Sequence, residues 1–157
     1  MKQIKKPVIV LLGPTAAGKT DWAINWQNQF KFIEIISVDS VMVYKECNIG
    51  SAKPSDEVLE KYPHHLINHV SVEHIFSVAN FYDTALQLIR NIHLQDKIPL
   101  MVGGSMMYFN LLKNGISLLP SSNKKLREKL KQKIVNDGVE SLYEDLFKLD
   151  PAAAGQI

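Results

Sequence analysis

The sequence predicts an α/β protein, a parallel sheet flanked by helices, followed by an all-helical segment after about residue 120. Two observations predict this fold. Short apolar runs alternate with helical patterns through the first two thirds of the chain, and only helical patterns remain beyond Pro120. Because parallel strands present their carboxyl ends at one edge of a sheet, we expect the loops that follow the strands to share that edge, where ligands bind.

Four short runs are expected to form the strands. Residues 8–12 (VIVLL) are rich in β-branched side chains and end at a glycine, which is typical of a buried parallel strand. Residues 32–38 (FIEIISV) and 98–102 (IPLMV) are similar, whereas residues 65–70 (HLINHV) carry a weaker strand pattern.

Helices are expected between these strands. Trp22, Ala23, Trp26 and Phe30 recur at helical spacing, so a helix is expected to begin near Lys19 with the tryptophans on its core face. Residues 78–97 carry a second apolar stripe, and a short helix after the last strand is expected to stop at Gly115.

The part beyond Pro120 divides into two further helical patterns. Leu126, Leu130 and Ile134 form one stripe, and a second stripe of leucines ends before Asp150-Pro151. We therefore expect an α/β core over residues 1–119 and a helical segment over residues 120–157.

Composition bounds the class of protein. The chain has 157 residues, 46% hydrophobic and 22% charged, which is ordinary for one globular domain. Cys47 is the single cysteine, so no internal disulfide can form and a reducing compartment is expected. No apolar run has the length of a membrane span, and we expect no membrane association and a cytoplasmic location. Nothing in the sequence indicates an oligomeric state.

The charge is unevenly distributed. The formal net charge of +2 does not by itself indicate a nucleic-acid partner. Residues 121–133 (SSNKKLREKLKQK) nevertheless carry six basic residues and one acidic residue. This segment is either a solvated helix face or a basic patch for RNA phosphates.

The motif with the clearest chemistry is GPTAAGKT, which consists of Gly13, Pro14, Thr15, Ala16, Ala17, Gly18, Lys19 and Thr20. It matches G-x-x-x-x-G-K-T between a strand and a helix, so the predicted sheet is P-loop NTPase-like. Backbone N–H groups of such a loop surround phosphates, Lys19 adds a positive charge, and the Thr20 hydroxyl can bind Mg²⁺. The motif leaves open which molecule carries the phosphates.

The acidic residue at the predicted ligand edge is Asp39, after the second strand. P-loop kinases and ATPases usually place an aspartate after a later strand, but the run 98–102 leads into Gly-Gly-Ser. Asp39 can be a metal partner, a general base, or a structural helix cap. The four histidines between residues 64 and 74 lack the spacing of a metal site, and a structural role or a position at the ligand edge is favoured for them.

Several motifs together carry a family resemblance. In chain order they are GPTAAGKT, EIISVDS, VYKECNIGSAKPS, PHHLIN, FSVANFYDTAL, KIPLMVGGSMMYF and LDPAAAGQI. This order resembles that of the tRNA dimethylallyltransferases, also called tRNA isopentenyltransferases. The resemblance covers nearly all of this chain and the amino-terminal half of a typical member, so we expect either a fragment or a naturally shortened protein.

The resemblance implies an activity and a set of site residues. It implies that Gly13 to Thr20 hold the diphosphate of dimethylallyl diphosphate with Mg²⁺, and that the dimethylallyl group passes to N6 of the adenosine 3′ to the tRNA anticodon. Lys19 and Thr20 would neutralise the leaving diphosphate, and Asp39 would accept the N6 proton. Contacts to the anticodon loop would come from Asp39, Ser40, Val41, Met42, Ser105 and Arg127.

Two alternatives remain from the sequence. One is a P-loop small-molecule kinase that uses ATP, which would explain the loop but not the missing acidic residue after the last strand. The other is a non-catalytic tRNA-binding remnant. If the chain acts without the second half of a typical member, we expect weak diphosphate binding and slow turnover.

Overall fold

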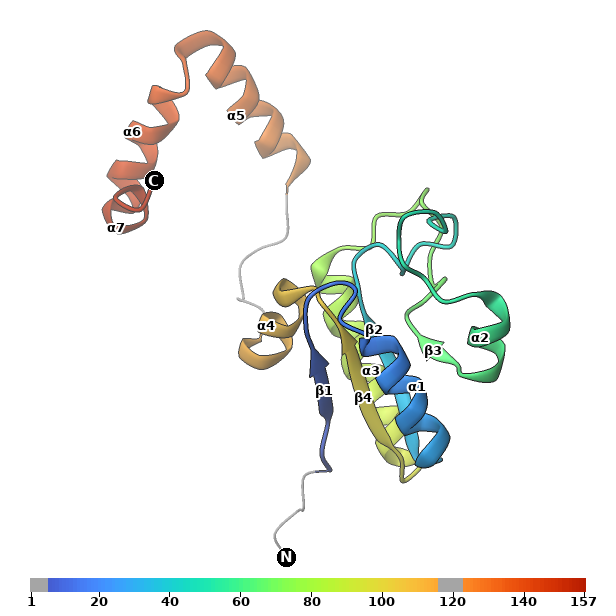
Figure 1. The fold of residues 1–157 in the computed structure, drawn as a ribbon. Helices are drawn as coiled ribbons and strands as arrows, with labels where there is room; N and C mark the ends of the chain where they lie inside the picture. Colours follow the sequence, from blue (N-terminus) through green and yellow to red (C-terminus); the bar gives the residue numbers. More distant parts are fainter. Residues whose placement is uncertain (1–5, 116–122) are drawn as a thin grey trace, which may run out of the picture. The chain divides into compact units, whose positions relative to one another are not determined.

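The computed structural model describes residues 6–115 and 123–157, which belong to two compact units, residues 1–116 and 117–157 (Figure 1). The boundary expected between residues 119 and 120 lies outside the described residues. Within the described residues, no helix has both the length and the apolar character needed to cross a membrane.

The first unit is built on a parallel sheet of four strands, β1 (Ile9–Leu12), β2 (Ile33–Val38), β3 (His64–His65) and β4 (Ile98–Gly103). Their spatial order is β1-β4-β2-β3. Gly103 pairs with both Leu12 and Val38, so β1, β4 and β2 end at the same level. The predicted α/β class with a parallel sheet is confirmed.

The expectation of a strand over residues 65–70 was wrong for most of that range. Leu66 and Asn68 have φ angles of 66° and 53°, which turn the backbone out of an extended path. Val70 forms only an isolated bridge with Tyr44. The two-residue β3 is tied to the sheet by Glu34 of β2, whose carboxylate accepts a bond from His65 Nε2 at 2.8 Å.

Four helices accompany the sheet: α1 (Lys19–Gln29), α2 (Asp56–Lys61), α3 (Val78–Leu94) and α4 (Met106–Asn114). Helix α2 is short and was not predicted. Helix α3 begins with a capping box between Ser77 and Asn80, and it ends before residue 97 because Asp96 takes a φ of 57°. Helix α4 ends at Gly115, as expected, where φ is 82°.

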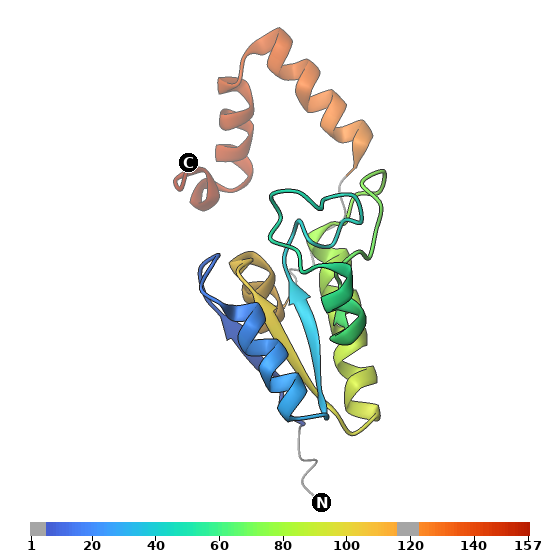
Figure 2. The same cartoon turned by 45° about the vertical axis from the view of Figure 1, so that its right-hand side comes forward.

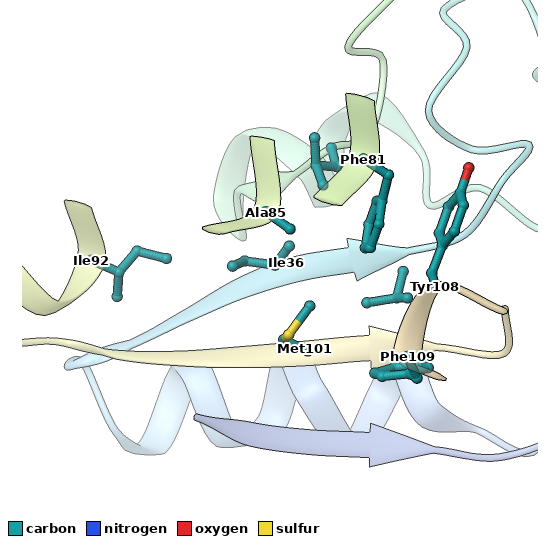
Figure 3. Packing of buried hydrophobic residues seen from close by; sticks show 9 residues of the cluster. Ile36, Phe81, Ala85, Ile92, Met101, Tyr108 and Phe109 are labelled. Atoms are coloured by element: carbon teal, nitrogen blue, oxygen red, sulfur yellow. The ribbon is translucent and has the colours of Figure 1, made fainter. Parts of the chain in front are cut away.

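Helices cover both faces of the sheet (Figures 1 and 2), and a cluster of buried residues lies on each face. Alternate residues of β2 and β4 point to opposite faces, so Ile36 and Met101 meet α3 and α4, while Ile35 and Leu100 meet α1. Figure 3 shows the first of these clusters, in which the Phe81 ring stacks on Tyr108 with centroids 3.9 Å apart.

The predicted core face of α1 was partly wrong. Ala23 is fully buried against the sheet, but the adjacent Trp22 is 58% exposed and Phe30 is 39% exposed. Neighbouring helical residues point about 100° apart, so a helix that packs closely through Ala23 turns Trp22 outward. Trp26 packs partly on the cluster and meets Trp22 edge to face.

The second unit consists of α5 (Lys124–Asp137), α6 (Glu140–Leu149) and α7 (Pro151–Ala154). Gly138, with a φ of 80°, separates α5 from α6, and Lys133 forms an ion pair with Asp145 between them. The helices match the predicted stripes. The side chains of the first stripe are exposed, and the most exposed of them, Leu126, has 55% of its surface accessible.

Candidate functional site

A cavity of about 670 Å³ opens where β1, β2 and β4 end. The side chains and backbone around it come from five segments of the first unit. They are Gly13–Asp21, Ser37 with Asp39, Val41 and Met42, Gly50–Ala52 with Pro54, His64 with Ile67, and Val102–Ser105. The predicted phosphate loop and the predicted edge residues Asp39, Val41, Met42 and Ser105 therefore lie around one cavity.

The phosphate loop turns from β1 into α1 through two residues in the left-handed region. Ala16 has a φ of 64° and Gly18 a φ of 73°. Gly18 is the N-cap of α1 and offers no side chain, so no side-chain cap satisfies the first N–H groups of the helix. These N–H groups and the helix dipole favour an anion at this position. The Lys19 ammonium donates to the Pro14 carbonyl at 2.6 Å, which holds its charge over the loop.

Asp39 follows β2 directly. Its Oδ1 accepts hydrogen bonds from the N–H groups of Val41 at 2.8 Å and Met42 at 3.0 Å, which closes a turn. Among the described residues, Oδ2 has no recorded hydrogen-bond partner. The expectation of a helix cap was wrong, because no helix begins after Asp39 and its Oδ1 closes a turn instead. The structural role in this turn and a functional role are compatible, because the other carboxylate oxygen is available to a ligand.

The Asp39 carboxylate also acts on the hydroxyl group of Tyr108. Burial raises the pKa of Tyr108, and the negative charges of Tyr44 and Asp39 raise it further. The Tyr108 ring stacks on Phe81, and Figure 3 shows it at the end of this core cluster. The Asp39 carboxylate is therefore close enough to influence the Tyr108 hydroxyl at the end of this cluster.

The end of β4 approaches β2 more closely than any side chain would permit. A Cβ at Gly103 would lie 2.1 Å from the Val38 carbonyl oxygen. The same carbonyl accepts a hydrogen bond from Ser105 N–H at 3.3 Å, and Ser105 then begins α4 as its N-cap. Glycine at this position brings Ser105 and Asp39 to the same edge.

Two predicted tRNA contacts do not line the cavity. Ser40 is exposed in the turn that Asp39 closes, so its predicted contact to the tRNA stays a prediction. Arg127 lies on α5 in the second unit, where it is exposed. Its predicted tRNA contact stays a prediction.

Sequence reasoning missed the wall formed by residues 50–54 and 64–67. His64 Nδ1 lies 2.6 Å from the Tyr62 carbonyl and must donate to it, so Nε2 is left with a lone pair. Burial lowers the pKa of His64. The hydrogen bond to the Tyr62 carbonyl raises this pKa in part, and the neighbouring His65 lowers it further. His64 Nε2 and Ser51 Oγ are buried without a hydrogen-bond partner in the described structure. A sequence signal for this wall was present, because the Gly- and Pro-containing stretch NIGSAKPS is typical of an irregular loop near a ligand site.

The fold and the site together define a class. A loop of phosphate-binding sequence after the first strand, and a carboxylate after the next, give the arrangement that is typical of phosphate sites in parallel α/β proteins, with an acidic side chain added. Within residues 6–115 and 123–157, no group of three or more His, Cys, Asp or Glu side chains could hold a metal ion.

Comparisons with known proteins give the family. The family model for IPP transferase matches residues 42–157, and the chain belongs to this family. It is 47% identical over 155 residues to the tRNA dimethylallyltransferase of Vesicomyosocius okutanii subsp. Calyptogena okutanii, covering 99% of this chain and 50% of the relative. It is 42% identical over 150 residues to that of Psychrobacter sp., covering 96% and 41%.

Solved structures agree with this assignment. The full-length tRNA isopentenylpyrophosphate transferase of Bacillus halodurans matches with a TM-score of 0.68 and 36% identity, over 98% of this chain and 50% of the other. A eukaryotic dimethylallyltransferase acting on tRNA matches with a TM-score of 0.79 and 30% identity, over 98% and 38%. The family resemblance read from the sequence is confirmed. The chain spans about half the length of the curated relatives it matches.

Proposed function

We propose that this chain carries the donor-binding part and the proton acceptor of a tRNA dimethylallyltransferase. The reaction transfers a dimethylallyl group from dimethylallyl diphosphate to N6 of the adenosine 3′ to the tRNA anticodon. The observation that carries the proposal is the position of the phosphate loop and of Asp39 around one cavity. The family membership and the names of the relatives support the transfer of a dimethylallyl group to tRNA, and the diphosphate donor and the N6 acceptor are part of the proposal.

The phosphate loop would hold the diphosphate. The uncapped N–H groups at the start of α1 donate to its oxygens, and Lys19 exchanges its bond with the Pro14 carbonyl for a phosphate oxygen. As the C–O bond to the dimethylallyl carbon breaks, negative charge grows on the diphosphate, where these donors already point. Stabilising that charge favours the transition state over the ground state.

Asp39 would receive the proton. The exocyclic amine of adenine is a poor nucleophile, so it must lose its proton as the N6–C bond forms. Oδ1 is held by two backbone N–H groups, which fixes the carboxylate, and Oδ2 is available to the amine. The target base must leave its stack in the anticodon loop to reach this position.

Mg²⁺ fits the donor set as a partner of the diphosphate. The Thr20 hydroxyl lines the cavity beside Lys19, and Mg²⁺ at phosphates commonly uses few protein ligands. When bound, the ion would neutralise charge on the departing diphosphate.

The tRNA would be bound by residues of the cavity and of α5. Ser105 lines the cavity, and Arg127 lies on α5 with five exposed or partly exposed lysines between residues 124 and 133. Such a helix suits RNA phosphates, and binding through it should weaken as the salt concentration rises. A substrate tRNA also makes the cytoplasm the fitting location.

The test is a transfer assay under single-turnover conditions, with the chain in excess over an anticodon stem-loop RNA, because slow transfer is then measurable. We expect label from dimethylallyl diphosphate to appear on the target adenosine with the wild type and not with Asp39→Asn. Transfer that is equal in both would contradict the role of Asp39. Transfer of phosphate from ATP would favour the kinase alternative, and stem-loop binding without any transfer would favour the RNA-binding remnant.

A further inference from the structure

The Lys53 ammonium is held by three short hydrogen bonds beside the cavity. It donates to the Tyr44 carbonyl at 2.8 Å, to Asn48 Oδ1 at 2.9 Å and to Asn68 Oδ1 at 2.8 Å. The Lys45 carbonyl lies farther from the ammonium, at 3.4 Å, so the three N–H donors of the ammonium are assigned to the three shorter bonds. All three acceptors are neutral oxygens, and none of the ion pairs within the described residues includes Lys53.

These acceptors belong to two segments, residues 42–48 and 66–70. Four backbone hydrogen bonds join the segments directly: Lys45 N–H donates to the Val70 carbonyl at 2.9 Å, Asn68 N–H to the Met42 carbonyl at 3.1 Å, and the N–H groups of His69 and Val70 to the Val43 carbonyl at 2.8 and 3.1 Å. Lys53 adds charge-assisted bonds to both of them.

The backbone around Lys53 is strained. Ala52, Leu66 and Asn68 have φ angles of 55°, 66° and 53°, in the left-handed region that disfavours residues other than glycine. Such conformations persist only where the surroundings hold them, and they gather at functional sites. Lys53 directly follows one of these residues and binds the side chain of another.

The wall that Lys53 adjoins is unlike the phosphate loop. Ser51 and Pro54 line the cavity on either side of Lys53 in sequence, and His64 and Ile67 line it too. Ser51 Oγ and His64 Nε2 are the buried atoms without a partner there. Neutral polar and apolar atoms of this kind suit a nucleotide base better than a diphosphate, which the loop at residues 13–20 is built to bind.

We propose that Lys53 is a positioning residue, which joins segments 42–48 and 66–70 and thereby fixes the wall of residues 51–54 for the nucleotide that accepts the prenyl group. The identity of that ligand rests on the proposed function. A lysine is required because a point charge with three divergent donors matches three converging oxygens, whereas the planar fork of arginine does not.

Cys47 provides a probe that needs no ligand. It is the single thiol of the chain, partly buried within segment 42–48, so its alkylation rate reports how often that segment opens. Lys53→Met keeps the length of the side chain but removes the donors. Lys45→Met is the matched control, because it removes the same charge two residues from Cys47 while breaking none of the bonds described for Lys53.

The two variants are expected to differ. Lys45→Met removes a positive charge but none of these bonds, so alkylation should not accelerate in this variant. Loss of the three bonds should instead accelerate alkylation by about tenfold in Lys53→Met. Asn48→Ala removes one acceptor at an exposed position and should give a smaller acceleration, which keeps the test valid if Lys53→Met does not fold. Unchanged or slower alkylation in both Lys53→Met and Asn48→Ala would overturn the proposal.

A binding arm connects the wall to its ligand. We expect Lys53→Met to bind an anticodon stem-loop about tenfold more weakly than the wild type, with the affinity for inorganic pyrophosphate unchanged. An equal loss for both ligands would overturn the proposal, because the variant would then have damaged the whole site. If the wild type binds no stem-loop, the proposed function fails, and the alkylation comparison still decides whether Lys53 joins the two segments.

Discussion

Replacing Gly103 by alanine tests whether the close approach of β4 and β2 builds the site. The added Cβ would lie 2.1 Å from the Val38 carbonyl oxygen and 2.6 Å from the carbonyl carbon. Ordinary contact begins near 3.4 Å, so the strands must separate by about 1.3 Å. Because the clashing atoms are backbone, no side chain can rotate away to relieve the contact.

The cost can be worked out from the bonds at this point. Overpacking of a rigid core costs about 1–3 kcal/mol, and a weakened hydrogen bond from Ser105 N–H to the Val38 carbonyl costs about 1 kcal/mol more. We therefore expect Gly103→Ala to lower the free energy of unfolding by about 3 kcal/mol, a large part of the stability of a small domain. Pyrophosphate affinity should fall as well, because the carboxylate after Val38 and the loop after β1 share this edge.

The assay is urea denaturation followed by far-UV circular dichroism, with Gly104→Ala as the matched control. A Cβ at Gly104 would meet only the Gly13 carbonyl oxygen, at 3.4 Å, so this variant should lose less than about 1 kcal/mol. Equal losses in the two variants, or a Gly103→Ala protein as stable as the wild type, would refute the reasoning.

Three further variants test the core, the sheet edge and the site. Phe81→Ala removes a ring that is 1% exposed and should lower the free energy of unfolding by about 3–5 kcal/mol in urea denaturation. Burial raises the pKa of Glu34, but bonds and charges from Lys97 and His65 lower it below the ordinary value of 4.5. Its contribution to stability is therefore complete above that value and lost as the pH falls through the lower folded pKa, so acid titration should destabilise the wild type more steeply than Glu34→Gln. Asp39→Asn keeps an oxygen for the two backbone N–H groups, so the melting temperature should change little while transfer falls by about 10²- to 10⁴-fold.

Much of the fold could be predicted because its signals are local. The runs that became β1, β2 and β4 are short, apolar and bounded by turn residues, and the phosphate loop identifies its own place between a strand and a helix. The right-handed connection rule then places Asp39 and Ser105 at the edge where the loop lies. That placement agrees with the residues around the cavity.

What could not be predicted depends on contacts between distant residues. Leu66 and Asn68 adopt left-handed backbone conformations that interrupt the expected strand, and no local sequence pattern predicts these conformations. Trp22 is exposed because the packing distance at Ala23, a tertiary property, decides which side of α1 faces the sheet. The wall around Lys53 was missed for the same reason, since its acceptors lie five to fifteen residues away in sequence.

The most direct test of the central claim is calorimetric titration of the chain with dimethylallyl diphosphate and, separately, with ATP, both in Mg²⁺. Lys19→Ala removes the loop cation, and Lys31→Ala serves as the control because Lys31 is an exposed lysine beyond the far end of α1. We predict that dimethylallyl diphosphate binds more tightly than ATP, and that Lys19→Ala abolishes this binding while Lys31→Ala preserves it. Tighter binding of ATP, binding that survives Lys19→Ala, or no binding of either ligand would contradict the claim that this cavity is the donor site.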